Sequence, residues 1–114
     1  MLISLFTFLM TGIFFIVFAI LFISKKIKMN SWYGIRTPIT TLSEKIWYKV
    51  HSIMGRYLLC CGLLISSLSI YYYYDYTGDN FFRIYVLLFI LIISSIFFIF
   101  LSKKVSYKIY KEYY

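Results

Sequence analysis

Three long apolar runs constrain what this chain can fold into. They cover residues 2–24, about 54–74 and 81–102, and they contain most of the hydrophobic residues, which make up 62% of the 114 positions. A helix of about 20 residues is long enough to cross a hydrocarbon core of roughly 30 Å. A soluble fold of this length could not bury so much apolar surface. The runs therefore predict three transmembrane helices.

Strands are the alternative for runs rich in Ile, Phe, Val and Tyr. A membrane barrel, however, needs alternating apolar and polar residues and many more strands than this chain can supply. Because lipid offers the backbone no hydrogen bonds, a spanning segment must satisfy its own, and of the two alternatives only the helix does so here. We predict an all-α membrane protein with one domain over residues 1–114, in which a loop at about 25–53 separates the first two membrane helices. The first run lacks a preceding basic residue and a cleavage pattern, so we expect it to be retained.

Small residues mark the faces on which these helices are expected to pack. They are Thr7, Thr11, Gly12 and Ala19 in the first run, and Gly62 and Ser66, four residues apart, in the second. Small side chains let helix backbones approach closely in lipid. We expect these positions to lie at helix–helix contacts.

The basic residues gather on one side of the predicted membrane. Between the first two runs lie Lys25, Lys26, Lys28, Arg36, Lys45, Lys49 and Arg56, and after the third lie Lys103, Lys104, Lys108 and Lys111. The connection at residues 75–80 holds two acids and no base. The positive-inside rule then predicts a cytoplasmic loop and C-terminus, with the N-terminus outside. Because these charges would meet anionic headgroups, the net charge of +8 indicates the lipid bilayer as a partner and no direct nucleic-acid partner.

Two charged segments flank the third run. Arg83 lies near its outer end, where the side chain can reach the headgroups as an anchor. The tail, residues 103–114, alternates lysine with tyrosine. This pattern suits a segment that lies on an anionic leaflet.

The sequence offers little for catalysis, cofactors or metal ions. His51 is the one histidine, and none of the four acids lies in a membrane run, so no carboxylate pair or metal cluster is evident. Ser43 and His51 are two turns apart on one predicted helix, too far for a nucleophile and its base. We expect no enzyme activity, no cofactor and no metal. Transport is also weakly supported, because no run is polar or broken at the midplane, although a homo-oligomer can form a path between subunits.

The polar segment at residues 30–55 is predicted to form a turn followed by a helix. Gly34 permits backbone angles that other residues resist, and Pro38 keeps Thr37 out of a helix. Thr41 and Glu44 form a capping-box pattern. The helix should therefore start at about residue 42.

This predicted helix is amphipathic and is expected to lie in the cytoplasmic interface, before the second membrane helix. Its apolar side holds Leu42, Ile46, Val50 and Ile53, and its opposite side holds Lys45, Lys49, Ser52 and Arg56. A straight continuation into the membrane would span roughly 50 Å, more than the bilayer, so we expect a bend near Gly55. A second row repeats every four residues and is expected to face the turn at residues 33–38. It consists of Ser43, Trp47, His51 and Gly55.

The string MNSWYGIRTPITTLSEKIWYKVHSIMG, residues 29–55, resembles the core of the SdpI/YfhL family. The matching residues are Asn30, Tyr33, Gly34, Arg36, Thr37, Pro38, Ser43, Trp47, His51 and Gly55, followed by two membrane helices. The resemblance extends from about Met29 to the end of the third helix. It implies a bacterial multi-pass protein of the cell membrane. The best-studied family member protects its host against a secreted killing peptide and recruits a transcriptional repressor to the membrane.

The ten matching residues form a candidate cytoplasmic binding site, for which there are two hypotheses. In the first, the protein gives immunity against, or senses, a membrane-active peptide toxin, and the loop transmits or supports that state. In the second, it is a docking or anionic-lipid-binding subunit without an immunity role. Arg36, Trp47 and His51 would then recognise a headgroup or a cytoplasmic partner such as a repressor, since arginine suits paired recognition of phosphate or carboxylate.

Each of these three residues also has a simpler interpretation. Arg36 can be a topology charge, Trp47 an interfacial anchor, and His51 a hydrogen-bonding residue that closes the turn onto the helix. The sequence alone leaves these alternatives open.

Overall fold

The computed structural model describes residues 2–30, 32, 34–75 and 81–113. This part of the chain forms three helices, α1 (Leu2–Ile23), α2 (Glu44–Tyr74) and α3 (Phe81–Tyr113), and has no strand. Each helix is long and apolar enough to cross a membrane. The prediction of an all-α protein with three membrane-spanning helices is therefore confirmed.

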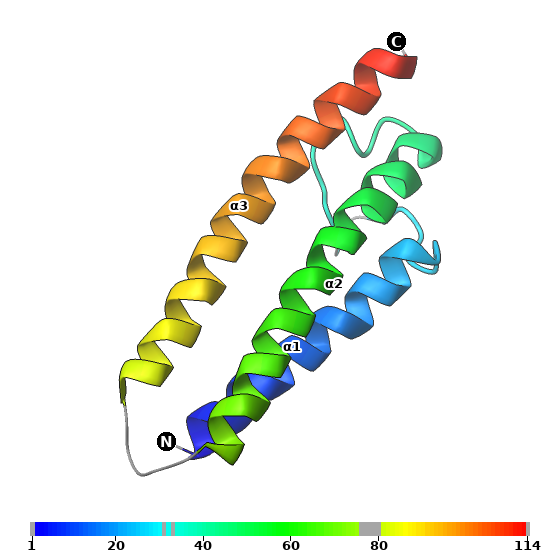
Figure 1. Cartoon of the computed structure of the whole chain (residues 1–114). Helices are drawn as coiled ribbons and strands as arrows, with labels where there is room; N and C mark the ends of the chain where they lie inside the picture. Colours follow the sequence, from blue (N-terminus) through cyan, green and yellow to red (C-terminus); the bar gives the residue numbers. More distant parts are fainter. Residues whose placement is uncertain (1, 31, 33, 76–80, 114) are drawn as a thin grey trace.

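The three helices form an elongated bundle, 56 Å long, with α2 in the middle (Figure 1). α1 packs closely along one side of α2 and α3 along another, whereas α1 and α3 barely touch each other. The centre of the bundle is therefore α2, and its two neighbours are held mainly through it.

Glycines bring α1 and α2 into close antiparallel contact. A Cβ atom added to Gly62 would lie 2.8 Å from the carbonyl oxygen of Gly12, and one added to Gly55 would lie 3.1 Å from that of Ala19. Gly12 and Ala19 are seven residues apart, as are Gly55 and Gly62, so the same small-residue contact occurs twice along the pair. Close backbone approach of this kind lets helices pack in lipid without a hydrophobic driving force.

The packing faces expected from small residues are largely confirmed. Gly12, Ala19, Gly62 and Ser66 are buried between α1 and α2. Thr7 is exposed instead, and its hydroxyl donates to the carbonyl oxygen of its own helix one turn earlier.

α2 differs from the prediction at its start. The helix begins at Glu44, and the backbone N–H of Ile46 donates to the hydroxyl of Ser43 at 3.3 Å. Ser43 is therefore the N-cap, a role that the predicted capping box gave to Thr41. From Glu44 the helix continues without interruption to Tyr74. The helix is therefore unbroken at Gly55, where the sequence predicts a bend, and α1 approaches closely at this glycine.

The predicted interfacial helix is the first part of α2 itself. Two residues of its predicted apolar side, Ile46 and Val50, are fully buried, while Leu42 and Ile53 are 54% and 40% exposed. The buried pair packs against protein, in a cluster with Ile109 near the end of α3. The apolar face of the first turns of α2 thus contacts α3 rather than a lipid interface.

The prediction that the tail lies on a leaflet is wrong, because residues 103–113 continue α3. Ile109 is 2% exposed and sits among Ile46, Val50 and Met54 of α2. At the rim, the Nζ atom of Lys49 lies 3.4 Å from a carboxylate oxygen of Glu112. The tail therefore has a protein surface to bind, formed by the first turns of α2.

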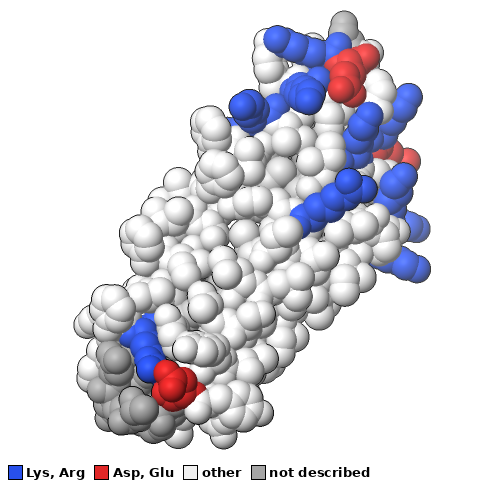
Figure 2. Space-filling view, viewed as in Figure 1, with Lys and Arg blue, Asp and Glu red and all other residues white. Residues whose placement is uncertain are grey.

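The bundle ends in a structure that we call the basic cap, made of residues 24–54 of the loop and early α2, and 103–113 of α3. At 1.5 Å per residue α2 and α3 are about 46 and 50 Å long, so both are longer than a hydrocarbon core of about 30 Å. Lysine and arginine side chains crowd this end of the molecule (Figure 2). The turns of α2 and α3 that exceed the length of the hydrocarbon core thus form the helical part of the basic cap.

At the opposite end Arg83 joins α2 to α3. Its Nη2 atom is 2.8 Å from a carboxylate oxygen of Asp75, and its Nη1 donates to the backbone carbonyl of the same residue at 2.7 Å. Arg83 therefore binds the C-terminal end of α2, where a cation is stabilising, in place of the predicted role as a headgroup anchor.

The glycine contact gives a test of the fold. Gly62→Leu should lower the thermal midpoint of unfolding in detergent, because even its Cβ would meet Gly12 and Ile16, and overpacking typically destabilises by about 1–3 kcal/mol. Ser67→Leu, at an exposed position of the same helix, is the matched control and should change little. Equal midpoints for the two variants would contradict the close approach of α1 and α2.

Candidate functional site

The candidate site is organised around His51, whose imidazole is 1% exposed. The backbone N–H of Ile35 donates to Nε2 at 2.9 Å, and Nδ1 lies 2.7 Å from the carbonyl oxygen of Trp47. An amide N–H can only donate, so Nε2 must be the unprotonated acceptor, and Nδ1 then carries the proton that Trp47 accepts. The two bonds fix a neutral imidazole in one tautomer.

Two aromatic rings hold the imidazole in place. Trp47, one turn earlier on α2, stacks on it with ring centroids 4.2 Å apart, and the ring of Phe22 of α1 lies perpendicular to it with centroids 4.8 Å apart. With its bond to Ile35, His51 contacts α1, α2 and the loop at once. This single side chain therefore joins three parts of the chain that are distant in sequence.

Trp47 is part of the core, so the alternative that it is an interfacial anchor is wrong. Its side chain is fully buried and its indole N–H donates to the carbonyl oxygen of Ile27 at 3.1 Å. Phe22, Ile27 and Trp47 form a buried cluster where the loop leaves α1. A tryptophan satisfies its N–H in this way when it is taken away from water.

Gly34 is needed for two separate reasons. Its φ angle of +98° lies in the region that side chains rarely adopt, and an added Cβ would lie 2.8 Å from Nε2 of His51. The same Cβ would lie 3.1 Å from the Trp47 ring. The close approach of the loop to α2 thus depends on the absence of a side chain here.

The remainder of the turn is held by two threonines. The Thr40 hydroxyl is buried, accepts from the backbone N–H of Thr37 at 2.8 Å and donates to the carbonyl oxygen of Ile35 at 2.8 Å. The Thr37 hydroxyl accepts from the backbone N–H of Thr40 at 3.1 Å. Thr40 was not predicted as a site residue. The signal for it was the spacing of two threonines around Pro38, which is typical of a hydroxyl-capped turn.

The structure brings some of the predicted site residues together and separates others. Gly34, Trp47 and His51 are in direct contact. Ser43 caps α2, and Gly55 packs on α1. The Asn30 side chain accepts from the backbone N–H of Trp32 and donates to the carbonyl oxygen of Lys28.

Arg36 and Pro38 are exposed at the surface of the turn. Arg36 forms no hydrogen bond or ion pair with the described part of the chain. Tyr33 lies outside the described residues. Of the ten predicted positions, Arg36 is thus the one that combines exposure with a charge.

In this arrangement the site is suited to positioning a loop. Both ring nitrogens of His51 are occupied by backbone groups, which leaves no ring nitrogen free for a ligand. Among residues 2–30, 32, 34–75 and 81–113, no three His, Cys, Asp or Glu side chains are grouped so that they could hold a metal ion. The contacts among Gly34, Trp47 and His51 hold the turn at residues 34–40 against α2, and Arg36 is exposed on the surface of this turn.

The His51 bonds can be tested by protease access to the loop. His51→Ala leaves the buried N–H of Ile35 without an acceptor, which typically costs about 1–3 kcal/mol and raises the population of the opened loop roughly fivefold to a hundredfold. Trypsin cleavage after Arg36 should accelerate accordingly, as followed by mass spectrometry. Ile53→Ala, on the outward side of the same helix, should cleave like the original protein. Unchanged cleavage in His51→Ala would mean that this residue does not hold the loop.

The sequence model of the SdpI/YfhL protein family matches residues 26–102, which include the whole loop from Lys26 onward, α2 and the membrane-spanning part of α3. No curated protein and no solved structure matches significantly. The match covers more than half of the chain, and the chain therefore belongs to the SdpI/YfhL family.

Proposed function

We propose that this protein gives immunity against, or senses, a membrane-active peptide toxin in a bacterial cell membrane. It would do so without enzyme activity, as a multi-pass protein with its basic cap in the cytoplasm and its N-terminus outside. Membership of the SdpI/YfhL family and three helices that can span a membrane support this proposal.

The observation that carries the proposal is the position of His51. The residue contacts Phe22 of α1, Trp47 of α2 and Ile35 of the loop, and the neighbouring cluster around Ile35 includes Ile109 of α3. Any peptide that changes how the three spans pack would thereby also move the turn at residues 34–40. A membrane event would reach the cytoplasmic surface through direct contacts, as sensing requires.

The proposal predicts that cells lacking the gene become sensitive to the cognate peptide. Restoring the natural protein, or Ile53→Ala, should restore survival, whereas His51→Ala should restore it poorly at equal membrane abundance. The measurement is the peptide concentration that halves growth, with protein amount followed by immunoblot. Deleted cells as resistant as the parent would rule out the immunity role.

A second candidate function is docking at the cytoplasmic face, either to a partner such as a repressor or to an anionic headgroup. It is favoured by Arg36, which is exposed on the turn and forms no hydrogen bond or ion pair with the described residues. Trp47 and His51 are buried, so in this conformation they would contribute by holding the turn rather than by touching the partner.

Arg36→Lys tests this second function, because it keeps the charge and removes the planar fork that pairs with carboxylate or phosphate. Binding to a captured cytoplasmic partner, or to vesicles containing phosphatidylglycerol, should weaken by about fivefold or more, since a charge-assisted pair contributes roughly 1–3 kcal/mol. Lys104→Arg, also at the basic end, is the control. Equal binding of Arg36→Lys and the natural protein would remove Arg36 from the function.

A further inference from the structure

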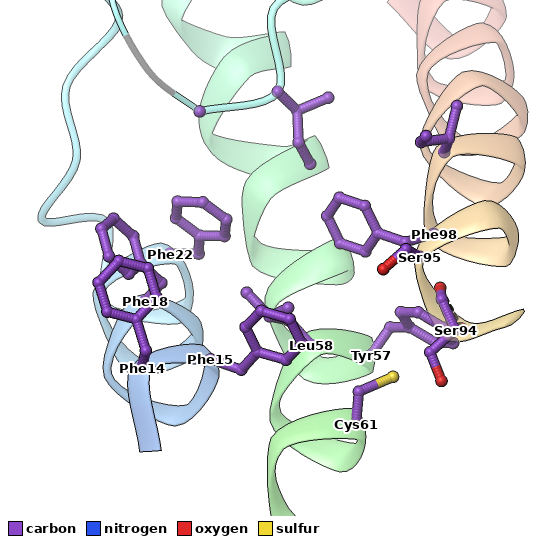
Figure 3. Close-up of a pocket in the computed structure, with 13 residues that line it drawn as sticks. Phe14, Phe15, Phe18, Phe22, Tyr57, Leu58, Cys61, Ser94, Ser95 and Phe98 are labelled. Atoms are coloured by element: carbon purple, nitrogen blue, oxygen red, sulfur yellow. Dashed lines mark hydrogen bonds between the residues drawn. The ribbon is translucent and has the colours of Figure 1, made fainter. Parts of the chain in front are cut away.

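A groove opens between α1 and α3 over one face of α2, where the two outer helices do not meet (Figure 3). Its cavity volume is about 370 Å³. α1 contributes four phenylalanines and α3 contributes a fifth. These are Phe14, Phe15, Phe18, Phe22 and Phe98. The groove lies in the half of the bundle nearest the basic cap, because Gly34 and Ile35 of the loop form its roof.

Two polar side chains of the groove form hydrogen bonds within the protein. The Tyr57 hydroxyl donates to the backbone carbonyl of Ser94 at 3.1 Å, and the Ser95 hydroxyl donates to that of Leu91 at 2.8 Å. The rest of the lining is mainly aromatic and aliphatic. A hydrocarbon chain therefore matches this surface, whereas a polar ligand would find few groups there to replace its hydrogen bonds to water.

The size of the groove favours a thin occupant. One turn of a helix, about 10 Å wide and 5.4 Å high, already fills roughly 400 Å³, so a transmembrane helix of a second protein could not be enclosed. From Phe14 to Phe22 the groove follows about 12 Å of α1. That length corresponds to the upper part of an acyl chain entering from one leaflet.

Charge at the roof indicates the headgroup. Ile35 lines the groove, and the next residue, Arg36, is exposed and without an ion pair or hydrogen bond to the described residues. Lys25 and Lys26, just after α1, are exposed at the same end, where the basic side chains gather (Figure 2). A phosphate joined to an acyl chain offers an anion to the basic side chains at this end and a hydrocarbon tail to the apolar groove.

We propose that the groove binds one acyl chain of an anionic phospholipid, whose phosphate is held by Arg36 at the roof. The bound chain would press on Ile35, which His51 holds, so the lipid becomes part of the support of the loop. This site goes beyond the immunity function, and its headgroup part rests on the docking function, with which it shares Arg36 and the anionic headgroup. Because its test contains no peptide, its failure leaves the immunity function standing. The groove-filling variants keep Arg36, so they separate failure of the acyl-chain site from failure of the docking function.

The test reconstitutes the full chain in vesicles of equal amounts of phosphatidylglycerol and phosphatidylcholine, extracts it in mild detergent, and identifies the retained lipids by native mass spectrometry. The natural protein should retain phosphatidylglycerol in preference. Ser95→Leu and Ser94→Leu fill the groove without removing a contact between helices made by the side chain, and should lower retention about tenfold, because several buried CH₂ groups lose their site. Ser67→Leu, on the exposed side of α2, is the matched control and should retain lipid normally.

Arg36→Gln separates headgroup from chain. It should still retain lipid but lose the preference for phosphatidylglycerol, and circular dichroism should show unchanged helix content in every variant. Full retention by both groove-filling variants would overturn the groove as the site. Retention of the two lipids in the proportion supplied would overturn the headgroup assignment, and a dimer that disappears with Ser95→Leu would make a second copy the occupant instead.

Discussion

The neutral imidazole of His51 is the interaction on which the basic cap depends. It accepts a hydrogen bond from the loop at Ile35 and donates one to Trp47 of its own helix, while the ring of Phe22 of α1 packs perpendicular to it. A charged imidazole would have two donors, and Nε2–H would then face the N–H of Ile35. The arrangement is therefore specific to one protonation state and one tautomer. The hydrogen bond from Ile35 to His51 also requires Gly34, because only a residue without a side chain lets the loop come this close to the imidazole.

Helix length explains why this cap exists. α2 and α3 are both longer than a bilayer core requires, and their extra turns pair with each other through Ile46, Val50 and Ile109. The loop then needs only to lie across a surface that the helices have already formed. α1 ends earlier, at Ile23, and its last residues meet α2 at Gly55. The unequal lengths leave a stepped end on which the turn at residues 34–40 rests.

The sequence predicted the spans well because run length and lack of charge are set by the bilayer, whatever the packing. It also predicted the row of Trp47 and His51 that faces the turn, since a period of four residues marks one side of a helix. It failed for the tail, where lysine and tyrosine obscure Leu101, Val105 and Ile109, which are four residues apart and face α2. It could not decide whether Trp47 is buried or interfacial, because a tryptophan near a membrane end is common to both cases and only the position of Ile27 distinguishes them. The binding roles of the ten site residues stay predictions.

The most direct measurement of the central role of His51 is the ¹⁵N spectrum of its side chain in the reconstituted protein at neutral pH. If His51 holds the loop as described, Nδ1 carries the proton and Nε2 is unprotonated, with a coupling to the amide proton of Ile35. A protonated Nε2, or an imidazolium with both nitrogens protonated, would contradict the hydrogen bond from Ile35 and with it the link between the loop and the membrane helices.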